Sequence, residues 1–208
     1  MIRDMHFHNM GYLDVTIPTP LFNSLKTECD TALENNKEMK SGLSGAGVPI
    51  HKYVEDKDNL KNLQDYLYSL VEVYREKFGL DPSDTKTLTN NLPFKMGKPW
   101  INYQKKYQFI PKHGHDGIFS YTIWMNIPYN ADEELKNGGL HASTFEFTYF
   151  DTQGGIRSDN IKLNKSDNGR MLFFPATMTH QVYPFYTSDD YRVSISGNLL
   201  LDATKYVK

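Results

Sequence analysis

The feature that most constrains the fold of this chain is a change in hydrophobic period near residue 97. Before that point, apolar residues recur every three or four positions, as on one face of an α-helix. After it, apolar and polar residues alternate as far as about residue 200, which is the pattern of half-buried β-strands. Two helices followed by a run of strands predict an α+β, mainly β fold, with the helices packed on one sheet of an antiparallel sandwich or open barrel.

The first part of the chain carries the signals for one strand and two helices. Residues 11–18 alternate enough for a short opening strand. Thr19 followed by Pro20 predicts an N-cap and a first helical residue, and a helix of about four turns follows. A second helix is expected to begin near residues 56–58 and to end at Gly79.

The second part of the chain predicts six strands, separated by Gly, Asn, Asp and Pro. Their expected ranges are 99–110, 118–127, 140–150, 170–175, 180–185 and 191–200. The acidic run 132–134 predicts a solvated loop face. We interpret residues 1–208 as one domain, in which 1–95 form a helical support and 96–202 form the strand-rich core.

Charge and cysteine content limit the classes of binding partner and the cellular compartment that we expect. The formal net charge of −2 leaves no basic footprint for nucleic acid, and no apolar run approaches the roughly 20 residues that cross a membrane. The lone Cys29 excludes an internal disulfide and suits a reducing compartment. We therefore expect a soluble, cytoplasmic protein without nucleic-acid or membrane partners. A homodimer stays open.

Two histidines one residue apart form the first candidate metal site. His113 and His115 lie between two strand-forming runs, and side chains at i and i+2 of a strand point to the same face. A third ligand must come from elsewhere, and His180 at the head of a later strand is the candidate. The His6–His8 pair has the same spacing in an unremarkable terminus, so the spacing alone is more often structural.

An arginine on the last predicted strand adds a candidate anion site. Arg192 is followed by Val193 and Ile195, which alternate as buried residues do, and Ser194 lies on its own face of the strand. A buried guanidinium needs a partner, and its planar fork of donors matches a carboxylate. A histidine-rich metal centre beside such an arginine is typical of non-haem Fe(II), which keeps coordination positions open for a co-substrate and O₂.

The motifs in the strand-rich part resemble those of a known enzyme family. They are Trp100-x-Asn102, FIPKHGH at 109–115, Ser120 opening an apolar strand, Gly138-Gly139 before STFEFTY, FFPATMTHQVYPF, and Arg192-x-Ser194. In this order, over roughly residues 95–200, they resemble the iron(II)/2-oxoglutarate-dependent dioxygenases of the prolyl-4-hydroxylase-like type. The similarity is greatest to the small versions found in phage genomes.

The resemblance implies a fold and a set of metal ligands. The fold is a double-stranded β-helix, a jelly-roll or cupin-like barrel, with residues 96–202 as the catalytic core. The implied ligands of Fe(II) are His113, His115 and His180. Most of the superfamily has His-x-Asp at the first pair, so Asp116 is the rival third ligand, and a two-histidine site completed by water stays open.

The resemblance also implies a co-substrate and a reaction. Arg192 would grip the C5 carboxylate of 2-oxoglutarate with help from Ser194, while Asn102 and Tyr103 would contact the same co-substrate. With O₂, and with ascorbate as a reductant, 2-oxoglutarate is converted into succinate and CO₂ as a C–H bond is hydroxylated. The substrate is unidentified. A peptidyl proline or another peptide side chain is the expectation by analogy, and a small molecule remains open.

Two other functions are compatible with the same residues. One is a cupin-like metal enzyme that uses the histidines without 2-oxoglutarate, in which case Arg192 faces substrate or a structural carboxylate. The other is a non-enzymatic jelly-roll module that binds a sugar or a protein partner. Turnover of 2-oxoglutarate with Fe(II) and ascorbate separates the three.

Overall fold

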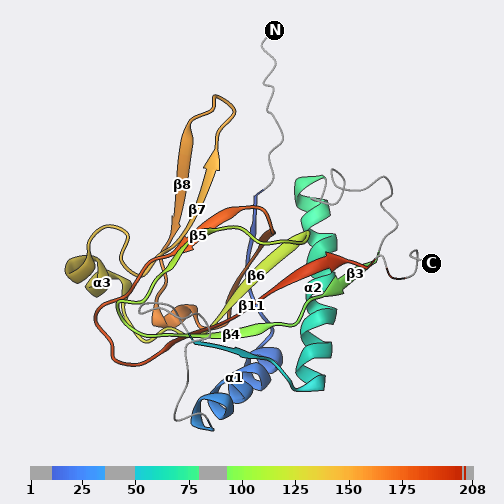
Figure 1. Ribbon diagram of the computed structural model, residues 1–208, viewed down its shortest axis with the longest axis horizontal. Helices are drawn as coiled ribbons and strands as arrows, with labels where there is room; N and C mark the ends of the chain where they lie inside the picture. Colours follow the sequence, from blue (N-terminus) through green and yellow to red (C-terminus); the bar gives the residue numbers. More distant parts are fainter. Residues whose placement is uncertain (1–10, 36–49, 80–92, 203, 205–208) are drawn as a thin grey trace.

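Two antiparallel sheets face each other in the computed structural model, and two long helices cover the outer face of the larger sheet (Figure 1). The structure describes residues 11–35, 50–79, 93–202 and 204, so the His6–His8 pair lies outside the described residues. The predicted mainly β architecture, a double-stranded β-helix with helices on one sheet, is confirmed.

The strands divide between a seven-stranded and a four-stranded sheet. The large sheet has the order β1 (Leu13–Thr16), β9 (Arg170–Pro175), β6 (Phe119–Asn126), β11 (Arg192–Leu201), β4 (Trp100–Gln104), β2 (Ile50–Tyr53), and β3 (Phe94–Met96) also pairs with β11. The small sheet has the order β5 (Ile110–His113), β10 (Thr179–Val182), β7 (Phe145–Phe150), β8 (Ile156–Ile161).

Both predicted N-terminal helices are present. Helix α1 spans Thr19–Glu34, but its N-cap is Pro18, so the prediction of Thr19 as a capping side chain is wrong by one residue. Helix α2 spans Lys57–Phe78; the carboxylate of Asp56 accepts from two backbone N–H groups of its first turn. The helix ends, as predicted, at Gly79 in the left-handed conformation that glycine adopts most easily. Among the described residues, no helix is long and apolar enough to cross a membrane.

Alternation along the strands of the large sheet creates two separate layers. On β11, Val193, Ile195 and Leu199 pack in the apolar cluster that includes α1 and α2. The alternate side chains, beginning with Arg192 and Ser194, line a cavity that faces the small sheet. The helix layer is therefore one apolar core, where each fully buried aliphatic side chain contributes about 1.5–3 kcal/mol. The opposite layer holds a second apolar cluster, which includes Trp124 and Phe174, and the polar cavity wall.

Several predicted strand boundaries are wrong. The expected strand 99–110 is two strands, β4 and β5, which belong to different sheets. Tyr107 lies in the connection between them with a positive φ of 67°. The expected strand 140–150 begins only at Phe145, and strands β3 and β8 were not predicted. Strand β8, IRSDNI, is an exposed edge strand with little apolar alternation, so its sequence lacks the usual signal.

The acidic run 132–134 is also not a solvated loop. It lies in helix α3 (Ala131–Gly138), whose N-cap Asn130 accepts from the backbone N–H of Asp132. Glu134 is 0% exposed, and its carboxylate accepts from the backbone N–H groups of Tyr186 (2.6 Å) and Thr187 (2.8 Å) as well as from the Thr187 hydroxyl. One acidic residue of the run thus fixes the segment that precedes β11.

We expect Glu134→Ala to lower the free energy of unfolding by about 2–3 kcal/mol, because three donors would be left without their charged acceptor. The matched control is Glu133→Ala, since Glu133 is exposed on the same helix and should change stability by less than about 0.5 kcal/mol. Urea unfolding of both variants measures the difference. Equal stability of the two variants would show that the buried carboxylate is not a structural anchor.

Candidate metal and co-substrate site

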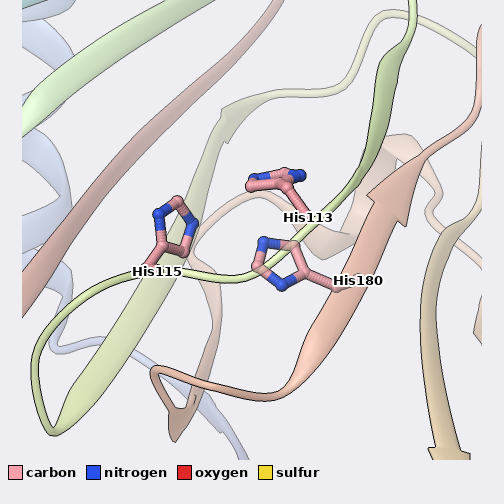
Figure 2. Close-up of side chains that lie close together, drawn as sticks. All are labelled: His113, His115 and His180. Carbon is pink, nitrogen blue, oxygen red and sulfur yellow. The ribbon is translucent and has the colours of Figure 1, made fainter.

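Three histidines from two distant parts of the chain meet at one end of the small sheet. His113 is the last residue of β5 and lies directly opposite His180 of β10 in the antiparallel pairing. His115 follows β5, and its backbone N–H donates to the carbonyl of Ala176 (2.8 Å). One nitrogen from each imidazole lies within 4.8 Å of the other two, and the three side chains gather around one point (Figure 2).

Backbone carbonyls orient two of the three imidazoles. Nδ1 of His113 lies 2.7 Å from the carbonyl oxygen of Pro111, and Nδ1 of His180 lies 2.9 Å from that of Met178. A carbonyl oxygen only accepts hydrogen bonds, so Nδ1 carries the hydrogen in both rings. The other ring nitrogen, Nε2, is then left with its lone pair. This is the second-shell arrangement that fixes the tautomer of metal-binding histidines in proteins.

Burial keeps two of the imidazoles neutral. It lowers the pKa of His180 to about 3, and the nearby His113 and His115 act in the same direction, whereas the hydrogen bond to Met178 opposes the change. Burial is also the main reason why the pKa of His115 is lowered to about 4, with His113 adding to the effect and Asp116 opposing it. Neutral imidazole is the form that binds a metal ion, so both rings are ready at neutral pH.

Asp116 does not join this group. It is exposed in the loop after His115, and the group whose ligand atoms converge consists of His113, His115 and His180. The strand alternation that predicted a common face for the histidine pair does not extend to His115, because β5 ends at His113. The convergence depends instead on the loop after β5, which is tied to Ala176.

The histidines border a cavity of about 720 Å³ between the two sheets. Its polar lining from the large sheet is His51, Asn102, Gln104, Thr122, Arg192, Ser194 and Ser196. Apolar side chains complete the wall, with Trp100 beside His115 (ring centroids 5.8 Å apart) and Phe145 stacked on His180 (5.2 Å). The cavity therefore brings together the predicted residues His113, His115, His180, Arg192, Ser194 and Asn102.

Tyr103 is not in this cavity, and the prediction that it contacts the co-substrate is wrong. Its side chain is fully buried on the helix side of the large sheet, where its hydroxyl donates to the carbonyl of Cys29 (2.7 Å). Neighbouring residues on a strand point to opposite faces, so Asn102 and Tyr103 cannot both reach one cavity. The same rule identifies Gln104, two residues from Asn102, as the cavity-lining residue that the sequence reading missed.

Asn102 belongs to a polar row across the cavity wall. Its Nδ2 donates to the hydroxyls of Ser194 and Ser196, both at 3.2 Å. Its Oδ1 and the Nδ1 of His51 on the neighbouring strand are buried without a partner among the described residues. The Nδ1 of His51 is thus a buried ring nitrogen at the cavity wall without a hydrogen-bond partner among the described residues.

Arg192 is 2% exposed and donates all five of its N–H groups. The acceptors are the Gln104 side chain, the Tyr129 hydroxyl and the carbonyls of Ser143 and Tyr183. The partner that a buried guanidinium needs is therefore supplied, for hydrogen bonding, by the protein itself. Every one of these acceptors is uncharged, however, so its positive charge has no carboxylate hydrogen-bonded to it among the described residues.

The family comparison matches the part of the chain that builds this site. The model of the 2OG-Fe(II) oxygenase family, where 2OG is 2-oxoglutarate, matches residues 98–198. This range contains all three clustered histidines and Arg192, whereas His51 lies outside it. A comparison with curated protein sequences finds no match.

Solved structures share the fold at low sequence identity. A prolyl-4-hydroxylase from Pseudomonas putida is 12% identical with a TM-score of 0.59, covering 93% of each chain. The viral collagen prolyl hydroxylase of Paramecium bursaria Chlorella virus-1, in complex with 2OG, is 12% identical with a TM-score of 0.52, covering 90% of this chain and 94% of that one. The epimerase SnoN with Fe³⁺, α-ketoglutarate and nogalamycin RO is 14% identical with a TM-score of 0.56, covering 93% and 80%.

The sequence match falls on the part of the fold that builds the site. The matched range supplies the central strands of the large sheet, the whole small sheet and the histidine cluster. The interpretation as a 2-oxoglutarate-dependent oxygenase is therefore favoured over a cupin-like metal enzyme without 2-oxoglutarate and over a non-enzymatic module. The match of residues 98–198 to the 2OG-Fe(II) oxygenase family, together with the shared fold, indicates an Fe(II)- and 2-oxoglutarate-dependent enzyme of this family.

Proposed function

We propose that the protein is a hydroxylase in which His113, His115 and His180 hold Fe(II). The observation that carries this proposal is the convergence of three imidazole nitrogens within 4.8 Å in the same cavity as a buried arginine. The donor set fits the ion, because carbonyls fix the tautomers of His113 and His180 and burial keeps His115 and His180 neutral. Three protein ligands leave coordination positions for a co-substrate and O₂.

We further propose that Arg192 binds the C5 carboxylate of 2-oxoglutarate, with Ser194 and Asn102 nearby on the same wall. A guanidinium surrounded only by neutral acceptors offers its full charge to an anion in a poorly hydrated site. Bound iron, 2-oxoglutarate and O₂ supply the oxidation that hydroxylates a C–H bond, with succinate and CO₂ as products. The chain itself supplies position, charge and exclusion of water.

The finer proposal for the substrate is a peptide side chain such as proline. Two structures of the same fold are prolyl hydroxylases, and the cavity wall near His115 and His180 is aromatic. A small molecule is the alternative, since SnoN, which shares the fold, was solved with nogalamycin RO.

The net charge of −2 argues against nucleic acid as a partner. The buried free thiol of Cys29 supports a reducing, cytoplasmic compartment.

The decisive test of the function is uncoupled turnover of 2-oxoglutarate to succinate by the purified protein with Fe(II) and ascorbate. We expect succinate to form, and we expect 2-oxoglutarate to raise the melting temperature of the Mn(II)-loaded protein. The variant His180→Ala should abolish both effects because it removes a proposed ligand. If the wild type shows neither effect, the proposal for 2-oxoglutarate is wrong.

Metal binding should depend on the three clustered histidines. His113→Ala, His115→Ala and His180→Ala should each weaken Mn(II) binding at least about tenfold, because each removes one of only three protein ligands. Asp116→Ala should retain binding, since Asp116 is outside the cluster. His141→Ala is the matched control, as His141 bonds to Asn160 away from the cavity. Calorimetric titration measures each affinity. Loss of Mn(II) binding in Asp116→Ala would show that Asp116, and not His115, is the third ligand.

The lowered pKa of His180 should make the metal-free protein acid-sensitive. Below about pH 6.5 the unfolded chain takes up a proton at this residue, whereas the folded protein does not until about pH 3. Stability should therefore fall as the pH drops below 6.5, by up to about 1.4 kcal/mol per pH unit from this group. Urea unfolding with chelator at pH 7 and pH 5 should show a smaller loss in His180→Gln than in wild type. Equal losses would contradict the lowered pKa.

A further inference from the structure

The cavity-facing side of Arg192 is covered by a single residue of the chain itself. Gln104 Oε1 accepts from both Nε (3.1 Å) and Nη2 (2.7 Å) of Arg192. Of the residues in the described part of the chain that accept hydrogen bonds from Arg192, Gln104 alone also lines the cavity. The Tyr129 hydroxyl and the two carbonyls hold the other N–H groups from outside the cavity lining.

A carboxylate that binds Arg192 from the cavity needs the position that Gln104 now occupies. Carboxylates take two N–H groups of a guanidinium side by side, and Nε with Nη2 is such a pair. Both of these N–H groups already point at one amide oxygen. A carboxylate and the amide oxygen, which carries a partial negative charge, cannot both accept from the same two hydrogens, and they repel each other at that distance. The ligand must therefore replace the amide oxygen rather than add to it.

The chain holds Gln104 in this position from its other end. Its Nε2 donates to the carbonyl of Gln108 (2.5 Å), and the side chain of Gln108 accepts from the backbone N–H of Lys105 (2.8 Å). The side-chain amide of Gln104 thus links the turn between β4 and β5 to the guanidinium of Arg192. A residue at this place can release Arg192 by rotating its side chain, without any change in the sheet.

We propose that Gln104 is a built-in substitute for the co-substrate carboxylate and selects co-substrates that carry one. In the free protein its amide oxygen satisfies Arg192, and a 2-oxo acid with a distal carboxylate displaces it. A 2-oxo acid with a neutral tail has too weak an acceptor to do so. Gln104 is in this sense a positioning and specificity residue for the co-substrate, and the inference rests on the proposed binding of 2-oxoglutarate at Arg192.

Two substitutions at one position test this inference with opposite expected results. Gln104→Ala removes the internal competitor, so 2-oxoglutarate should bind about three- to tenfold more tightly. Gln104→Glu places a permanent carboxylate on Arg192, so binding should weaken by at least about 30-fold, although the variant loses the hydrogen bond to the Gln108 carbonyl. Calorimetry of the full-length, Mn(II)-loaded proteins measures the dissociation constants, and Mn(II) affinity should be the same in wild type and both variants. If Gln104→Ala does not fold, Gln104→Met carries the same expectation.

The controls separate the inference from the proposed function. Gln153→Glu adds the same charge in an exposed turn and should leave 2-oxoglutarate binding unchanged. Weaker binding by Gln104→Ala would make the glutamine a direct ligand of the co-substrate and overturn the inference, as would unchanged binding by Gln104→Glu. If the wild type itself does not bind 2-oxoglutarate, the proposed function fails and the inference fails with it.

Discussion

The two faces of the large sheet are the constraint on which the rest of this structure depends. Each central strand presents one set of side chains to α1 and α2 and the alternate set to the cavity. A shift of one residue in β11 would exchange Ile195 for Ser194 and place a polar group against the helices. The apolar layer under the helices therefore does more than stabilise the fold. It determines which side chains face the histidines.

This alternation also explains how much the sequence revealed. The change of period gave the helices and most strands, and the i, i+2 rule put Asn102, Ser194 and Arg192 on one wall. Applied to every residue of β4, the same rule excludes Tyr103 from the cavity lining and includes Gln104. The error came from choosing adjacent residues rather than alternate ones.

The parts that were not predictable depend on contacts between distant segments. Nothing local to residues 132–134 shows that Glu134 caps the segment before β11, because its partners are about fifty residues away. Nor does the sequence near Arg192 show that four neutral acceptors take its five hydrogen bonds. The split of 99–110 into two sheets likewise depends on pairing of β5 with β10. In each case the chain's local pattern is compatible with more than one tertiary arrangement.

The pairing of His113 with His180 has a consequence for how the protein folds. These residues pair across β5 and β10, and the segment between them, 114–179, includes strands β6 to β9 and helix α3. Bringing the two ends of such a segment together is entropically unfavourable and slow relative to local contacts. An ion held by both side chains would cross-link the two ends of this segment. With the proposed ligands, a bound metal ion would join β5 to β10 as well as serve the reaction, so the small sheet would be less stable without it.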